Sequence, residues 1–280
     1  MKIQSDTNRR HFLRTSAVSA SALVGLGHWS SLLAAEPFGG LKMGVASYSL
    51  RKLTLDQAIA MTRELGVKGI TLKDVHLPMK STAAERKEAA KKIKDGGLEL
   101  MGVGVIYMKK EKASEIPGIF EYARDAGAPT IVCSPDPEVL DTVEKLAKET
   151  GIRIAIHNHG PTDKKYPSPL DALQLVKDRH ELMGLCMDVG HTVRIGQNPV
   201  EVIAACATRL YDFHMKDVTE ATAKGKCAIA GKGVIDVPAV LKALVNLKFK
   251  YQVALEYEID ESDPMPGMKA SFAYMSQVLG

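Results

Sequence analysis

Short apolar runs alternate with longer amphipathic segments along most of the chain. Eight runs rich in β-branched residues have the length of buried strands, at residues 42–47, 67–72, 98–106, 129–133, 152–157, 184–188, 209–214 and 251–256. Each is followed by a segment with apolar residues at helical spacing, at residues 54–65, 82–95, 112–126, 137–150, 168–178, 199–207, 236–247 and 266–278. Thr54 and Ser168 stand at helix N-cap positions, and Gly66, Gly127 and Gly151 follow predicted helix ends. The pattern predicts a strand followed by a helix eight times.

Eight strand–helix pairs in about 240 residues have the length and rhythm of an α/β protein, the (β/α)8 TIM barrel. An open doubly wound sheet is the alternative, but such a sheet usually carries a glycine-rich phosphate loop after its first strand. Residues 47–51 read Ser-Tyr-Ser-Leu-Arg and are not such a loop. Neither a linker nor a shift in composition follows residue 41, so we expect a single barrel domain over residues 41–280.

The first 35 residues differ in composition from the rest of the chain. Arg9 and Arg10 are followed by Phe12 and Leu13, and then by a weakly apolar stretch rich in Ala and Ser. This arrangement resembles a twin-arginine export signal. The sequence therefore predicts a signal peptide at residues 1–35, the twin-arginine export machinery as a partner, and a periplasmic or otherwise extracytoplasmic mature protein.

The composition narrows the function. The chain has 37 basic and 33 acidic residues and is 45% hydrophobic, as an ordinary globular protein is. Much of the basic excess lies in the predicted signal, so the mature part is nearly neutral and has no basic run, which argues against nucleic acid as a partner. After the signal no stretch approaches the ~20 consecutive apolar residues of a membrane span, and no Cys follows it for lipid attachment. We expect no membrane anchor and a small-molecule substrate.

Histidines and carboxylates gather at the predicted C-terminal ends of the strands, which in a barrel form the rim that carries the active site. A carboxylate in an apolar strand is costly unless it is paired or bound to a cation. Two such carboxylates and two imidazoles stand at the ends of four consecutive predicted strands. They are His157, Asp188, His214 and Glu256. Because Mg2+ and Ca2+ prefer oxygen ligands alone, this mixed set predicts one divalent transition ion, Mn2+, Co2+, Fe2+ or Zn2+.

Other polar residues at the same rim are candidates for contact with a substrate. They are Lys73, His76, His191, Arg194, Lys216 and Asp217. Lys73 follows an apolar strand and would donate to a sugar oxygen, while Lys216 and Asp217 would place a charged pair on the substrate. His159 would bond a substrate hydroxyl or orient a metal ligand. A structural role, as a loop histidine or a solvent-exposed lysine, is the alternative for these residues.

Five short motifs give the chain a resemblance to a known family. They are Ile156 to Gly160 (IHNHG), Asp188 to His191 (DVGH), His214 to Asp217 (HMKD), Gly231 to Asp236 (GKGVID) and Glu256 to Glu258 (EYE). As a set they resemble the sugar phosphate isomerase/epimerase family, also called the xylose isomerase-like TIM barrels, over about residues 42 to 278. The resemblance implies a divalent ion held partly by Asp188, His214 and Glu256.

The chain departs from this family pattern at the fifth strand. Where many members have Glu-Asn-His, it has His157-Asn158-His159. In epimerases of this family the carboxylates of strands five and eight move the proton on the two faces of the substrate carbon. With His157 in place of glutamate, this position still offers a metal ligand but no longer offers a carboxylate base. The resemblance therefore implies proton transfer by Glu256, with His157 or His159 as the second acid or base.

These features together predict a metal-dependent sugar isomerase or epimerase. It would remove an α-proton from an extracytoplasmic sugar and pass through a metal-stabilised enediolate. A lyase or hydratase that eliminates a β-substituent of a 3-keto-glycoside from the same enediolate is the first alternative. A non-catalytic carbohydrate-binding barrel is the second, and metal content distinguishes it from an enzyme. A metal-dependent endonuclease shares this barrel, but the near-neutral charge and the export signal argue against it.

Overall fold

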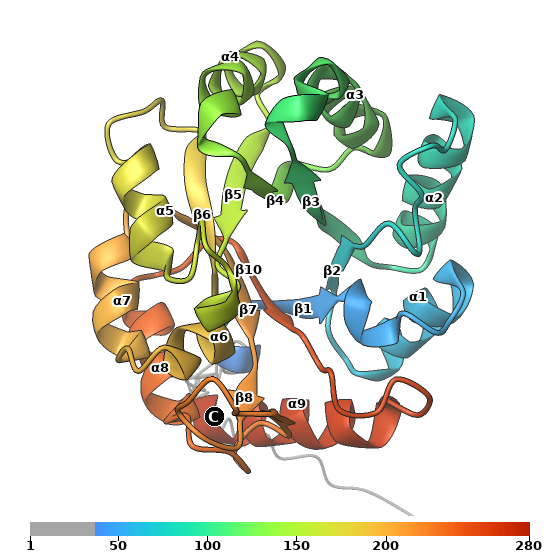
Figure 1. Ribbon diagram of the computed structural model, residues 1–280. Helices are drawn as coiled ribbons and strands as arrows, with labels where there is room; N and C mark the ends of the chain where they lie inside the picture. Colours follow the sequence, from blue (N-terminus) through green and yellow to red (C-terminus); the bar gives the residue numbers. More distant parts are fainter. Residues whose placement is uncertain (1–36) are drawn as a thin grey trace, which may run out of the picture. The chain divides into compact units, whose positions relative to one another are not determined.

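The computed structural model describes residues 37–280 and contains the predicted barrel (Figure 1). Its eight barrel strands are β1 (Lys42–Ala46), β2 (Gly69–Leu72), β3 (Glu99–Met108), β4 (Thr130–Pro135), β5 (Arg153–His157), β6 (Met183–Asp188), β7 (Leu210–Met215) and β10 (Gln252–Leu255). They pair in parallel and close in the order β1-β10-β7-β6-β5-β4-β3-β2. Each predicted strand is present within two residues of its expected bounds, which confirms the TIM barrel.

Helices surround the closed sheet (Figure 1). The α-helices of the described residues are α1 (Leu55–Glu64), α2 (Ala83–Asp95), α3 (Ile116–Ala126), α4 (Leu140–Thr150), α5 (Pro169–Val176), α6 (Val189–Arg194), α7 (Pro199–Cys206), α8 (Val237–Asn246) and α9 (Met265–Leu279). Thr54 and Ser168 cap α1 and α5 with their side chains, as predicted. Gly127 and Gly151 end α3 and α4 with φ of 71° and 72°, a conformation that glycine adopts without steric cost.

Short 3-10 helices account for the largest boundary differences. They are η1 (Pro37–Gly40), η2 (Ser47–Leu50), η3 (Lys110–Glu115), η4 (Pro137–Val139) and η5 (Gly160–Thr162). The segment predicted as one helix from residue 112 is divided, because η3 covers its first part and α3 begins at Ile116. Periodicity alone does not separate a 3-10 turn from the first turn of an α-helix.

Three short elements beyond β6 and β7 were not predicted. Helix α6 is six residues long, and strands β8 (Asp217–Val218) and β9 (Cys227–Ala228) form a two-stranded antiparallel sheet. These elements are too short for hydrophobic periodicity to register. Helix α6 begins where the Asp188 side chain accepts a hydrogen bond from the His191 backbone, so it depends on a residue of the predicted metal site.

Strand alternation directs the site residues into the barrel. On β5 the small inner cluster contains Ala155, whereas Ile154 and Ile156 belong to the main core between sheet and helices. His157 therefore has the inward orientation of Ala155, two residues before it. The register then sets Asp188 of β6 beside His214 of β7. The strands are buried on both faces, so this orientation follows from pairing and not from polarity.

The described residues leave the predictions for the N-terminal segment open. The predicted export signal at residues 1–35 lies outside residues 37–280, so export stays a prediction. Within the described part, no helix combines the length and the apolar character needed to cross a membrane.

Candidate metal centre and active site

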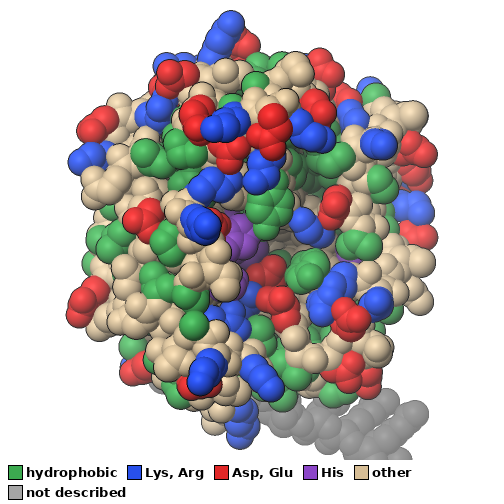
Figure 2. All heavy atoms as spheres, in the orientation of Figure 1, with side chains coloured by type: hydrophobic (Ala, Val, Ile, Leu, Met, Phe, Trp, Pro, Cys, Tyr) green, Lys and Arg blue, Asp and Glu red, His purple; other side chains and the backbone are tan. Residues whose placement is uncertain are grey.

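The C-terminal ends of the strands surround a cavity of about 270 Å³. Histidine side chains lie at the bottom of this hollow, and acidic and basic groups surround it (Figure 2). Seven of the predicted site residues line it, namely Lys73, His157, His159, His191, His214, Lys216 and Glu256. Tyr107 and Glu258, which were not predicted, also line it. The structure therefore brings most of the predicted rim together around one space.

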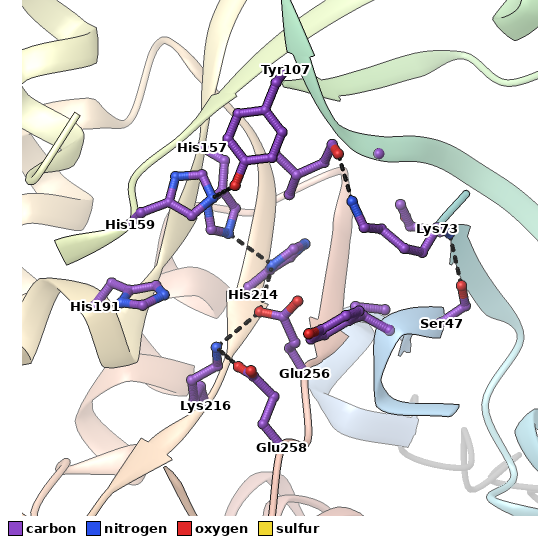
Figure 3. A pocket seen from close by; sticks show the side chains of 15 residues that line it. Ser47, Lys73, Tyr107, His157, His159, His191, His214, Lys216, Glu256 and Glu258 are labelled. Atoms are coloured by element: carbon purple, nitrogen blue, oxygen red, sulfur yellow. Dashed lines mark hydrogen bonds and ion pairs between the residues drawn. The ribbon is translucent and has the colours of Figure 1, made fainter. Parts of the chain in front are cut away.

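The four predicted metal ligands converge at this cavity, and Figure 3 shows three of them, His157, His214 and Glu256. His157, Asp188, His214 and Glu256 each offer one ligand atom, and these atoms lie within 4.8 Å of one another. The Nδ1 atom of His214 lies 3.1 Å from Nε2 of His157 and 3.2 Å from Oε2 of Glu256. Oδ2 of Asp188 lies 3.8 Å from Nε2 of His157. The sequence predicts that these four residues lie close together, and the geometry agrees.

Spacing and charge both fit a divalent cation. Ligand atoms bonded at about 2.1 Å to one four-coordinate ion lie about 3 to 3.5 Å apart, and the separations in the cluster include 3.1, 3.2 and 3.8 Å. Asp188, Glu256 and Glu258 surround Lys216, so with His214 neutral, as a metal ligand is, three carboxylates and one ammonium leave two negative charges to balance. Oδ2 of Asp188 is buried and makes no hydrogen bond with a described residue, although the Lys216 ammonium lies 3.0 Å away. The donor set of nitrogen and oxygen suits a transition ion.

Lys216 is a buried cation between carboxylates. Its Nζ lies 2.9 Å from Oε2 of Glu256 and also pairs with Glu258. Burial opposes its charge, yet the surrounding carboxylates, Asp188 foremost, raise the pKa of Lys216 well above its ordinary value. Burial would likewise raise the pKa of Glu256, but Lys216 and His214 hold that pKa well below its usual range. Glu256 is therefore ionised at neutral pH and able to accept a proton.

The two histidines of the cluster have different electrostatic surroundings. Burial, reinforced by the charge of His214, lowers the pKa of His157 well below its ordinary value, so the ring is neutral. Burial also opposes the charge of His214, but Glu256 beside it raises the pKa of His214 to about 9. The proton on His214 occupies the place of a cation, and a bound metal ion would replace it.

Asp212 lies behind His214 and was not predicted. Its Oδ1 is 3.8 Å from Nε2 of His214 and 3.6 Å from the thiol of Cys186. Burial raises the pKa of Asp212 to about 6. At this distance the carboxylate makes no hydrogen bond to the ring and acts on the charge of His214 instead. An acidic residue inside an apolar strand is the signal that identified Asp188, and the same signal applies to Asp212.

A hydrogen-bonded chain forms another part of the cavity wall. Nε2 of His159 lies 3.2 Å from the Tyr107 hydroxyl, and Nδ1 of His159 lies 3.1 Å from Oδ2 of Asp163. The rings of Tyr107 and His159 stack with centroids 5.7 Å apart. Neither Tyr107 nor Asp163 was predicted, because a tyrosine at a strand end and an aspartate in a loop carry no distinctive sequence signal.

His191 and Lys73 reach the cavity while bonded to backbone or neighbouring groups. Nδ1 of His191 lies 3.3 Å from the guanidinium of Arg194, which itself donates to the carbonyl of Gly225. Arg194 therefore contacts His191 from behind and is not part of the cavity lining. The ammonium of Lys73 donates to the carbonyl of Val105 at 2.8 Å.

The structure does not bring His76 or Asp217 to the cavity. The ring of His76 contacts the Ser47 hydroxyl and the Leu50 carbonyl, which joins the segments after β1 and β2. The Asp217 carboxylate accepts from four backbone amides, those of Val218, Gly231, Gly233 and Ile235. A buried carboxylate is stable when amides satisfy its charge, so Asp217 organises the loop after β9. We leave both residues out of the proposed site.

Replacing Asp217 with Ala should lower the free energy of unfolding by about 3 kcal/mol, because it leaves backbone amides of the loop without an acceptor. Urea denaturation followed by circular dichroism measures this loss. The control is Asp236→Ala, which removes the side-chain cap of α8 and should cost about 1 kcal/mol. If the two variants lose the same small amount, Asp217 does not hold the loop.

Comparison with known proteins identifies the family. The model of the xylose isomerase-like TIM barrel family matches residues 59–278. The chain belongs to this family. Among curated proteins, inosose dehydratase of Clostridium botulinum (strain Alaska E43 / Type E3) is 29% identical over 142 residues, which are 45% of this chain and 47% of that protein. The chain thus spans about half the length of this curated relative.

Solved structures of other proteins share the fold. The 3-keto-D-glucoside 4-epimerase of E. coli superposes with a TM-score of 0.69 at 18% identity, covering 85% of this chain and 99% of that one. The IOLI protein, whose structure holds a zinc atom, has a TM-score of 0.69 at 16% identity, covering 85% and 98%. At these identities the likeness shows a common fold.

Proposed function

We propose that this xylose isomerase-like barrel is a metal-dependent sugar isomerase or epimerase acting on an extracytoplasmic sugar. The observation that carries the proposal is the convergence of two imidazoles and two carboxylates within 4.8 Å at the cavity. Family membership supports sugar chemistry, and the zinc atom in the IOLI structure supports a divalent ion. The signal predicted at residues 1–35 supports an extracytoplasmic substrate.

Glu256 is placed to remove a proton from the carbon next to a sugar carbonyl. Its contacts with His214 and Lys216 both use Oε2, so Oε1 is left for the substrate. A divalent ion held by the four cluster residues would supply Lewis-acid polarisation of the carbonyl. Lys216 keeps Glu256 ionised, and the enediolate that follows proton removal stays bound in the cavity.

The β5 side of the cavity provides the second acid or base. The rings of His157 and His159 lie with centroids 4.5 Å apart, and both line the cavity. Either ring, once it has taken up a second proton from solvent, can return a proton to the enediolate, which completes isomerisation or epimerisation. Lys73 and His191 are placed to hold substrate oxygens, and Arg194 acts through its contact with His191.

Elimination is a second candidate reaction. The observation that favours it is a histidine, His157, at a position where many family members have glutamate. Asp188 is fully buried, so Glu256 is the one carboxylate of the four-residue cluster that lines the cavity. Loss of a β-substituent from a 3-keto-glycoside needs one base and one acid, which Glu256 and a histidine supply. The match to inosose dehydratase supports this alternative, and so does the shared fold with the 3-keto-D-glucoside 4-epimerase.

Metal analysis of the purified protein beside His214→Ala tests the proposal. We expect about one divalent transition ion per chain, lost in His214→Ala and retained in the control His180→Ala, which alters a histidine outside the cavity. The metal-loaded protein should then exchange the α-proton of keto-sugars with deuterated water. NMR of the products separates an epimer from an eliminated enone. A protein that takes up neither Mn2+, Co2+ nor Zn2+ would instead be a non-catalytic carbohydrate-binding barrel.

A further inference from the structure

The hydrogen bonds that connect Tyr107, His159 and Asp163 have a defined direction. Oδ1 of Asp163 accepts from the backbone amides of Lys165 and Tyr166, which holds this carboxylate in place. Because an ionised carboxylate only accepts, the hydrogen of a neutral His159 ring lies on Nδ1, toward Asp163. Nε2 then carries a lone pair and accepts the hydroxyl hydrogen of Tyr107.

This direction determines what Tyr107 offers to a ligand. A tyrosine hydroxyl has one hydrogen, and that hydrogen is directed to His159. The side chain lines the cavity and is 53% exposed, and stacking on His159 holds its ring (Figure 3). The oxygen therefore presents lone pairs to the cavity. A ligand atom at this point must donate a hydrogen bond, as a hydroxyl does and a phosphate oxygen does not.

The charges around the cavity lead to the same conclusion. Two lysines line it, and both lie next to carboxylates: Lys216 lies among three, and Lys73, which donates to the Val105 carbonyl, has its Nζ 3.7 Å from Oδ1 of Asp74. No arginine is among the lining residues of the described chain. A divalent ion would neutralise the two excess negative charges of the cluster and leave no positive charge over. A phosphate group would lose its hydration without a compensating cation.

We propose that the cavity selects an uncharged, hydroxyl-bearing ketose or keto-glycoside over its phosphorylated counterpart, with Tyr107 accepting a hydrogen bond from a substrate hydroxyl. This inference rests on the proposed function and names the substrate class of the same site. Tyr107 contacts the substrate directly, whereas Asp163 is a positioning residue that acts through His159.

The test compares two ligands that differ only in the phosphate group. D-fructose and D-fructose 6-phosphate are titrated into the Zn2+-loaded full chain, and saturation-transfer NMR gives each Kd. We expect D-fructose to bind at least tenfold more tightly than its phosphate. Tyr107→Phe should weaken D-fructose binding about fivefold to tenfold, the loss of one hydrogen bond. The control Tyr251→Phe removes a tyrosine hydroxyl next to the N-terminal end of β10, outside the cavity lining, and should change neither Kd.

Asp163→Asn tests the direction of the hydrogen bonds that run from Tyr107 through His159 to Asp163. The amide can donate to Nδ1 of His159, which moves the ring hydrogen to Nε2 and frees the Tyr107 hydrogen for the ligand. The preference for D-fructose over its phosphate should therefore decrease. If Asp163 had a purely structural role, binding of both ligands would weaken by the same factor. The inference is overturned if metal-loaded wild type prefers the phosphate or binds neither ligand, or if Tyr107→Phe binds D-fructose as wild type does. Metal analysis of the same samples reports separately on the proposed function, which fails if no ion is bound.

Discussion

Glu256→Gln should lower turnover of a keto-sugar about a thousandfold, because the neutral amide keeps the shape of the side chain and cannot accept a proton. Positioned general bases typically contribute a factor of about 100 to 10,000. The measurement is α-proton exchange with solvent deuterium at saturating Mn2+, with the bound ion counted in each sample. Saturating metal is needed because Glu256 also belongs to the predicted ligand set.

Glu258→Gln is the matched control for this prediction. It removes a neighbouring cavity carboxylate that also pairs with Lys216, but it leaves the four-residue cluster intact. We expect turnover to fall less than tenfold. Full turnover by Glu256→Gln, or equal losses in the two variants, would assign proton transfer to another group.

Lys216→Met should destabilise the metal-free protein by about 3 to 5 kcal/mol, since it leaves Asp188 and Glu256 buried without their cation. A divalent ion should restore much of this loss by supplying the missing positive charge. Urea denaturation with a chelator and with added Zn2+ measures both quantities.

Lys269→Met is the control, because Lys269 pairs with Glu64 at the exposed surface. Exposed pairs contribute at most about 1 kcal/mol, and added Zn2+ should not change the stability of this variant. If Lys216→Met is equally stable with and without metal, the ammonium and the ion do not share the same carboxylates.

Local patterning made the four-residue cluster predictable. His157, Asp188, His214 and Glu256 stand at strand ends, and a barrel brings the C-terminal ends of its strands to one rim. Once the order of strands and helices was recognised, membership of the rim followed for each of them. The orientation of His214 toward Glu256, at 3.2 Å, still required the pairing register of β7 and β10.

Neighbours in sequence proved to be separated in space. Lys216 pairs with Asp188 of the four-residue cluster, whereas Asp217 accepts hydrogen bonds from backbone amides of a loop 14 to 18 residues further along the chain. Asp217 begins β8, which pairs antiparallel with β9, and these two-residue strands have no periodic signal in the sequence. His76 likewise stands after a strand, but the Ser47 hydroxyl and the Leu50 carbonyl engage both of its ring nitrogens.

The sequence by itself determined the order of strands and helices, the barrel and the four ligand-type residues, because each depends on spacing along the chain and on the cost of a carboxylate in an apolar strand. Only the tertiary structure decided that Lys216 is shared by three carboxylates and that Tyr107 meets His159. These contacts join residues 28 to 52 positions apart, and their geometry depends on strand register and loop path. No local pattern records such distances, since loop closure and side-chain packing are properties of the folded chain.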